Sequence, residues 1–127
     1  MGISTEAMVG AKAELQQAIA AHGMWKSRLK TALAQGATDQ DVNVVRVDDA
    51  CAFGKWLKNC DASLKRAPFH DAVRLLHAEF HRRSAEVLTL VTSGKKADAE
   101  RLLGPKGAWT EASVALTAKM MEWQRTL

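Results

Sequence analysis

The sequence has no tyrosine, two prolines and two cysteines among its 127 residues, and no apolar run long enough to cross a membrane. A transmembrane helix needs about 20 consecutive apolar residues, so we expect no direct membrane insertion. The first ten residues, MGISTEAMVG, lack the basic start and the apolar centre of a signal peptide. We therefore expect a cytoplasmic protein, in which the two cysteines bind metal, react with oxidants or lie buried rather than form a disulfide.

A concentrated basic surface is also missing from the sequence. The net charge is only +4. The densest basic positions are three separated pairs, Lys65-Arg66, Arg82-Arg83 and Lys95-Lys96. Binding to nucleic acid needs lysines and arginines gathered in one patch or stripe. The sequence therefore predicts no nucleic-acid partner.

Strand-type runs are nearly missing, whereas the good helix formers Ala, Leu, Glu, Lys and Arg are plentiful. A chain of this length fits one domain and can bury a core without disulfides. We therefore predict a single domain over 1–127 with an all-α, four-helix-bundle-like fold and additional short helices.

Apolar residues that recur at steps of three and four define the expected long helices. The pattern predicts helices over 4–34, over 69–92 and from about 109 to the end, with short helices around 51–57 and 96–103. Gly104 and Pro105 are expected to interrupt the chain before the last helix. The β-branched run 42–47 has no second strand to pair with and is interpreted as an extended connector, and 59–68 as a loop.

Two histidines, His77 and His81, stand four residues apart in the segment LLHAEFHRRSAEV. On a helix, residues i and i+4 lie on one face, so both imidazoles can converge on one point. Taken alone, such a pair is a weak indication of a metal, because ordinary partly buried histidines give the same spacing. Two imidazoles on an apolar face are costly to bury, however, unless they share a partner.

His22 and Cys51 complete a candidate metal site. His22 lies in an apolar stripe between Ile19 and Trp25, and Cys51 opens the stretch CAFGKWL at the expected start of a short helix. A helix N-terminus lowers the pKa of a thiol and favours the thiolate. Three imidazoles and one thiolate form a complete tetrahedral set for Zn²⁺. The alternative interpretation is a buried histidine bonded to a carbonyl and a buried apolar cysteine.

Several neighbouring residues are assigned lesser roles. Asp48, Asp49 and Glu79 are candidates to accept an imidazole N–H behind the metal, although Glu79 is expected more readily at the surface. His70, two turns before His77, is interpreted as a surface or capping residue. Cys60 is interpreted as a loop cysteine, with a resolving role if Cys51 is oxidised as the alternative.

Together these residues resemble the bacterial chemoreceptor zinc-binding (CZB) domain. The matching elements are His22 followed by Trp25 and Lys26, then CAFGKWL at 51–57, HAEFH at 77–81 and GKKADAERLL at 94–103. The most specific of them is the Cys-x-Phe-Gly-x-Trp core. The resemblance covers the chain from about 10 to 125.

The resemblance implies a helical bundle that holds zinc through His22, Cys51, His77 and His81. It also implies a regulatory, non-enzymatic role in signal transduction, such as chemotaxis. The effector would be a chemoreceptor or a diguanylate cyclase, and the stimulus would be zinc or an oxidant such as hypochlorous acid acting on the zinc-bound cysteine. The sequence and the expected domain both end at residue 127. We therefore expect the chain to be either a fragment or a free-standing sensor that acts on a partner protein.

Two other functions remain open from the residues alone. The first is a zinc-dependent hydrolase with an open three-histidine site, for which no general base is placed by the ligands. The second is a metal-free helical interaction module. A homodimer is also expected from the resemblance, with Ala18, Ala21 and Met121 as candidates for its interface.

Overall fold

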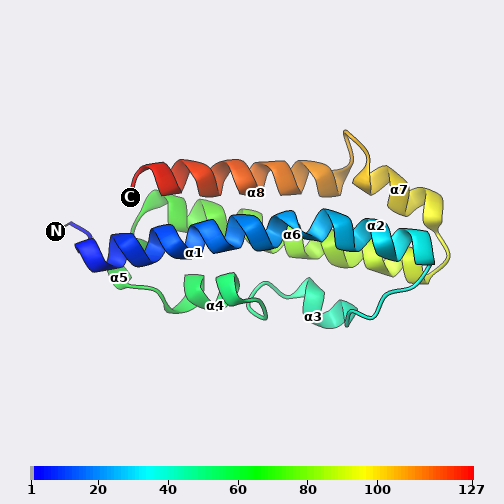
Figure 1. Cartoon of the computed structure of the whole chain (residues 1–127), viewed down its shortest axis with the longest axis horizontal. Coiled ribbons are helices and arrows are strands. Elements are labelled where there is room, and N and C mark those ends of the chain that lie inside the picture. The colour runs from blue at the N-terminus through cyan, green and yellow to red at the C-terminus, as the bar shows by residue number, and fades with distance from the viewer. Residues whose placement is uncertain (1) are drawn as a thin grey trace.

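The computed structural model describes residues 2–127, and over this range the chain forms eight helices and no strand. The predicted all-α, bundle-like fold is confirmed (Figure 1). In chain order the helices are α1 (Thr5–Gly23), α2 (Trp25–Gln35), α3 (Val42–Arg46), α4 (Ala52–Asn59), α5 (Ala62–Lys65), α6 (Pro68–Thr92), α7 (Lys96–Leu103) and α8 (Ala108–Arg125).

The predicted single helix over 4–34 is wrong, because the chain is interrupted at Met24. Ser4 begins α1 by accepting a hydrogen bond from the Ala7 N–H, and α1 ends at Gly23. The Met24 N–H turns back to the carbonyls of Ala21 and His22, which tightens the last turn. Helix α2 then continues in nearly the same direction (Figure 1). Glycine has a low helix propensity, which favours the interruption at this point.

The segment between α2 and α6 holds more helix than predicted. The run 42–47, expected to be extended, contains α3, and the expected loop 59–68 contains α5. Each short helix has an aspartate cap: Asp41 accepts the N–H of Asn43 at 2.9 Å, and Asp61 accepts that of Ser63 at 2.9 Å. Burial of Val45 and these caps outweigh the strand propensity of the β-branched residues.

The other predicted helices agree with the structure. Helix α6 begins one residue earlier than expected, α7 has the expected bounds, and Gly104 and Pro105 lie in the turn before α8. Gly94, with φ of 75°, occupies the left-handed conformation that ends α6.

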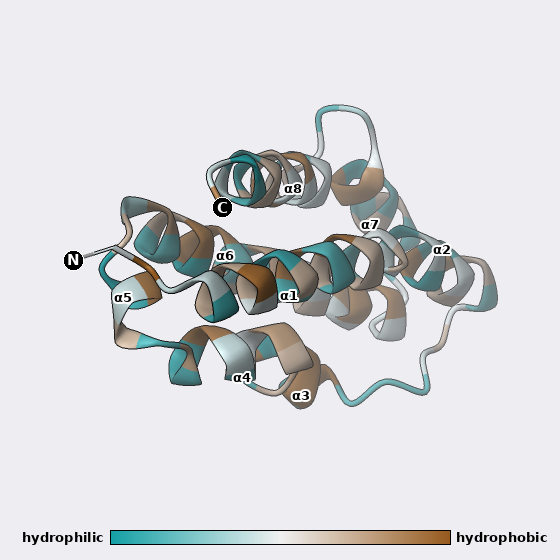
Figure 2. Cartoon of the chain, turned by 60° about the vertical axis from the view of Figure 1, so that its left-hand side comes forward, coloured by the Kyte–Doolittle hydropathy of each residue, from teal (hydrophilic) through white to brown (hydrophobic). Residues whose placement is uncertain are grey.

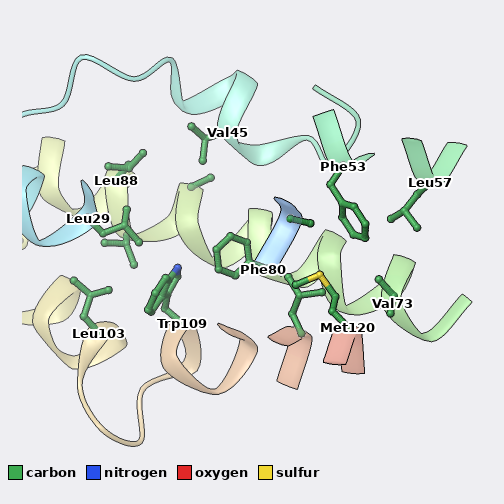
Figure 3. Close-up of a cluster of buried hydrophobic side chains, with 14 of the residues drawn as sticks. Leu29, Val45, Phe53, Leu57, Val73, Phe80, Leu88, Leu103, Trp109 and Met120 are labelled. Atoms are coloured by element: carbon green, nitrogen blue, oxygen red, sulfur yellow. The ribbon is translucent and has the colours of Figure 1, made fainter. Parts of the chain in front are cut away.

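The core surrounds α6, which packs against α8, α3, α7 and α2, while α1 closes the core by packing against α8 and α4 (Figures 1 and 2). Phe80 and Trp109 pack with ring centroids 5.7 Å apart (Figure 3). The Trp109 indole N–H donates to Ser84 Oγ at 2.9 Å, and that hydroxyl donates to the Phe80 carbonyl at 2.9 Å. The polar groups inside this part of the core are therefore satisfied.

Two surface properties bear on the predictions. None of the helices over 2–127 combines the length and apolarity that a membrane span requires. Ala18, expected at a dimer interface, is instead 3% exposed inside the single chain, whereas Ala21 and Met121 are exposed. Ala18 is buried because it lies on the same face of α1 as Leu15 and His22, and that face packs into the core of the bundle.

Candidate metal centre

Helix α6 carries His77 and His81 on its buried face. Their side chains are 0% and 4% exposed, and the two Nε2 atoms lie 3.0 Å apart. Helical spacing produces this convergence, because the side chains are separated by one turn. The two imidazoles therefore converge on one point.

His22 reaches the same point from the last turn of α1. It is buried, and its Nε2 lies 3.1 Å from Nε2 of His77. The interruption at Met24 comes two residues after His22 in the chain. His22 is therefore positioned by the end of α1 rather than by the middle of a longer helix.

Cys51 is the N-cap residue of α4, and its sulfur completes the cluster. Sγ lies 3.3 Å from His77 Nε2 and 3.5 Å from His81 Nε2, and it accepts the N–H of Gly54 at 3.4 Å. One ligand atom from each of the four predicted residues falls within 4.8 Å of the others. The structure therefore brings together all four candidates from three separate segments of the chain.

The groups behind the imidazoles are backbone carbonyls, not the predicted carboxylates. His22 Nδ1 donates to the Ala18 carbonyl at 2.7 Å, and His81 Nδ1 donates to the Val45 carbonyl at 2.9 Å. Within residues 2–127, His77 Nδ1 is buried without a hydrogen-bond partner. Carbonyl acceptors leave no trace in a sequence, because every residue carries one.

The predicted carboxylates lie elsewhere. Asp49 forms an ion pair with Lys58 at 3.6 Å, and Glu79 pairs with Arg82 and Arg83. Asp48 approaches the site through its backbone, whose carbonyl accepts the Cys51 thiol at 3.8 Å. The role predicted for all three carboxylates is therefore wrong, although the expected surface position of Glu79 agrees with its paired, partly exposed side chain.

Burial sets the protonation of the imidazoles. It lowers the pKa of His22 to about 4, which the hydrogen bond to Ala18 partly opposes. It lowers the pKa of His77 to about 2, and the neighbouring His81 and His22 lower it further. The pKa of His81 is also lowered by burial, against the bond to Val45 and the charge of Asp48. All three rings are therefore neutral at pH 7.

The same burial raises the pKa of the Cys51 thiol, and the N–H groups at the start of α4 lower it by less. The expected helix-terminus effect on the thiol is present, but desolvation outweighs it in the metal-free protein. A cation held by the cluster would reverse this balance, because a coordinated thiol is deprotonated.

The donor set fits a tetrahedral metal ion. With Nδ1 of His22 and of His81 donating to carbonyls, each Nε2 presents a lone pair to the centre of the cluster. Zn–N bonds of about 2.1 Å in a tetrahedron place the donors about 3.4 Å apart. Four of the six separations between donor atoms span 3.0–3.5 Å, and all six are within 4.8 Å. Lone pairs this close, in a buried space, require a proton or a cation between them.

Aromatic rings form the walls of the cluster. Phe53 packs edge-on against His77, with centroids 5.2 Å apart, and Phe80 packs edge-on against His22 at 5.1 Å. Both phenylalanines are buried. These apolar walls exclude water, which strengthens electrostatic interactions inside the site.

His70 and Cys60 lie outside the cluster, as predicted. Of the two roles predicted for His70, surface or capping, the surface position is wrong, because the side chain is only 7% exposed. Its Nε2 donates to the Leu57 carbonyl at 2.7 Å, and its ring meets Trp123 edge-on. Cys60 follows the last residue of α4 and is half-buried, with its thiol donating to the Leu57 carbonyl at 3.6 Å.

Comparison with known proteins relates the chain to a family. A family model described as the chemoreceptor zinc-binding domain matches 22–88, which is more than half of the chain and contains all four clustered residues. No curated protein and no solved structure matches the chain.

Proposed function

The chain belongs to the chemoreceptor zinc-binding domain family, and we propose that it is a zinc-binding regulatory domain of bacterial signalling. In this proposal His22, Cys51, His77 and His81 hold one Zn²⁺. The observation that carries the proposal is the convergence of three Nε2 atoms and one Sγ within 4.8 Å in a buried space. Zinc bound there would supply a rigid link between α1, α4 and α6.

A regulatory role is favoured over a catalytic one by the number of protein donors. A catalytic zinc site keeps one position open for water or substrate, whereas four protein ligands close the tetrahedron. A three-histidine hydrolase would need Cys51 displaced from the cluster. Its sulfur lies 3.3 Å from His77 Nε2, which argues against that alternative.

The responsive residue in this proposal is Cys51. It is the only donor on the short-helix segment between α2 and α6, and it is half-buried where the three histidines are buried. A thiolate attacks hypochlorous acid to give a sulfenic acid, with release of chloride, so that sulfur loses two electrons and chlorine gains them. The oxidised sulfur binds zinc more weakly, which would free the start of α4. Under a zinc-sensing alternative, metal occupancy itself orders this segment.

The output of the proposed domain requires another component. Family membership supports an effector domain or a separate signalling protein as the partner, and a cytoplasmic location. A homodimer is proposed on the same ground. Exposed Ala21 on α1 and Met121 on α8 are consistent with an interface there.

Metal analysis tests the proposed function directly. Protein purified under reducing conditions should contain one zinc per chain by elemental mass spectrometry. Cys51→Ala should lose most of its zinc affinity and its response to hypochlorous acid. Absence of metal, with none taken up from added zinc, would contradict the proposal. A Cys51→Ala variant with unchanged affinity and oxidant response would contradict the role of the cysteine.

A further inference from the structure

Gly54, in the first turn of α4, packs directly on the backbone of the turn that precedes Cys51. It is a buried residue. A Cβ atom added to it would overlap the Asp48 carbonyl oxygen and would lie 2.7 Å from the Asp48 carbonyl carbon and 2.9 Å from Asp49 Cα. All three neighbours are main-chain atoms, so no side chain can rotate away to make room.

The same turn positions the thiol. The 48–50 turn leads into Cys51, and the Asp48 carbonyl, against which Gly54 packs, also accepts the Cys51 S–H. The N–H of Gly54 donates to Cys51 Sγ at 3.4 Å. Gly54 is thus in contact with both ends of the turn, and the sulfur stands between the glycine and the histidines of α6.

From this contact we infer that Gly54 is a positioning residue of the metal centre. The absence of its side chain lets the 48–50 turn close against α4 and holds Cys51 Sγ within reach of His77 and His81. The inference rests on the proposed zinc site and deepens it, since it assigns the placement of the fourth ligand to a residue that touches no metal. Any side chain at 54 moves the turn outward and takes the sulfur with it.

Two other glycines provide matched controls. Gly10 lies in α1, and a Cβ there would have no neighbour within 4 Å. Gly107, the N-cap of α8, is also packed against backbone, because a Cβ there would overlap the carbonyl oxygens of Leu102 and Arg101. Gly107→Ala therefore reports the effect of backbone overlap away from the metal centre, and Gly10→Ala reports the effect of an added methyl group alone.

Cobalt binding by the full chain separates positioning from general loss of stability. Bound Co²⁺ absorbs by thiolate-to-metal charge transfer only when Cys51 is a ligand. Gly54→Ala should lower Co²⁺ affinity by about 10- to 100-fold, the usual effect of disturbing the groups that orient a ligand. It should also lose the thiolate band, as Cys51→Ala does. Gly10→Ala and Gly107→Ala should keep that band at full intensity when saturated with metal.

A second variant covers the case in which Gly54→Ala does not fold. One glycine inserted between Asp49 and Ala50 leaves residue 54 unchanged but lengthens an exposed turn, which chains generally tolerate. This insertion should also reduce the thiolate band. A full thiolate band and unchanged affinity in either folded variant would overturn the inference.

The reactivity of the Cys51 thiol in metal-free protein tests the role of Gly54 independently of zinc binding. In metal-free protein carrying Cys60→Ser, the half-buried Cys51 should react with a disulfide reagent several-fold faster once Gly54 is replaced by alanine. Wild-type protein without a thiolate band would contradict the proposed zinc site alone. Equal thiol reactivity with Gly54 and with alanine, measured in that metal-free background, would overturn the role of Gly54 whatever the metal result.

Discussion

Burial shifts the pKa values of the clustered imidazoles and of the Cys51 thiol in opposite directions. Burial lowers the pKa values of His22 and His77 to about 4 and about 2 and raises the pKa of the Cys51 thiol. Metal ligands must be deprotonated to bind. At neutral pH the three imidazoles are therefore already neutral and have no proton to release on metal binding, whereas the Cys51 thiol still holds its proton.

Zinc binding should consequently release about one proton per chain at pH 7, and that proton comes from Cys51. The number can be measured by calorimetry in buffers of different ionisation enthalpy. Cys51→Ala should release almost none. Release of two or more protons would mean that at least one imidazole is protonated before the metal binds.

A buried histidine outside the cluster also carries a prediction. His70→Ala should destabilise the protein by about 1–3 kcal/mol, because the Leu57 carbonyl loses its imidazole donor in a buried place. Urea unfolding of the zinc-saturated protein measures the change. His70→Gln, which retains an N–H donor, should recover part of the loss, and both variants should bind one zinc. Unchanged stability of the alanine variant would show that the hydrogen bond contributes little.

At the scale of helices, we expect α3 and α4 to depend on the cluster more than α6 and α8 do. α4 contributes Cys51 at its start, and α3 contributes the Val45 carbonyl that orients His81. Both helices are short, with five and eight residues, so their own hydrogen bonds stabilise them little. Their order should follow the state of the metal.

Hydrogen exchange measured by mass spectrometry tests this dependence. Removal of zinc with a chelator should increase exchange at backbone amides over 42–59 by at least about tenfold, with a much smaller change in the middle of α6 and α8. Cys51→Ala should show the faster exchange even with zinc present. A uniform increase over all helices would instead indicate that the metal stabilises the bundle as a whole.

The helices also show which features the sequence could predict. The three- and four-residue apolar period of α6 and α8 is strong, and it placed His77 and His81 correctly on a buried face. The same period continued through Met24, where a local turn interrupts the helix without changing the phase. Helix α3 was missed because its valines favour strands, and only the cap at Asp41 and the burial of Val45 oppose them.

The cluster of four side chains was predictable as a set of residues but not as a geometry. Spacing and the Cys-x-Phe-Gly-x-Trp core indicated the four candidate donors, which the structure brings together. The carbonyls of Ala18 and Val45 could not be identified, because the acceptor atoms belong to the backbone. Burial of His70 was indicated by its phase with His77, but its place near a helix start argued for the surface.

For the whole molecule, the buried imidazoles make the metal-free fold sensitive to acid. Below their ordinary pKa of 6.5 the histidines of the unfolded chain take up protons, whereas in the fold His22 resists protonation down to about 4 and His77 down to about 2. The unfolded state binds more protons in this window, so stability falls as pH falls. Each such histidine costs about 1.4 kcal/mol per pH unit there.

Urea unfolding of chelator-treated protein should therefore show a clear loss of stability between pH 7 and pH 5, above the range in which carboxylates titrate. His22→Gln removes one of the titrating groups and should weaken this dependence. A free energy of unfolding that stays constant from pH 7 to pH 5 would contradict the burial of neutral imidazoles.

The distances along the chain between the clustered donors have a consequence for biosynthesis. His22 and His77 are separated by 55 positions, and Cys51 and His77 by 26. Contacts this distant in sequence form late, because long loops must close first. On the ribosome, His22 and Cys51 emerge well before either histidine of α6. A nascent chain therefore has no complete site to offer, and in the proposed function zinc would enter only after α6 has been synthesised and packed.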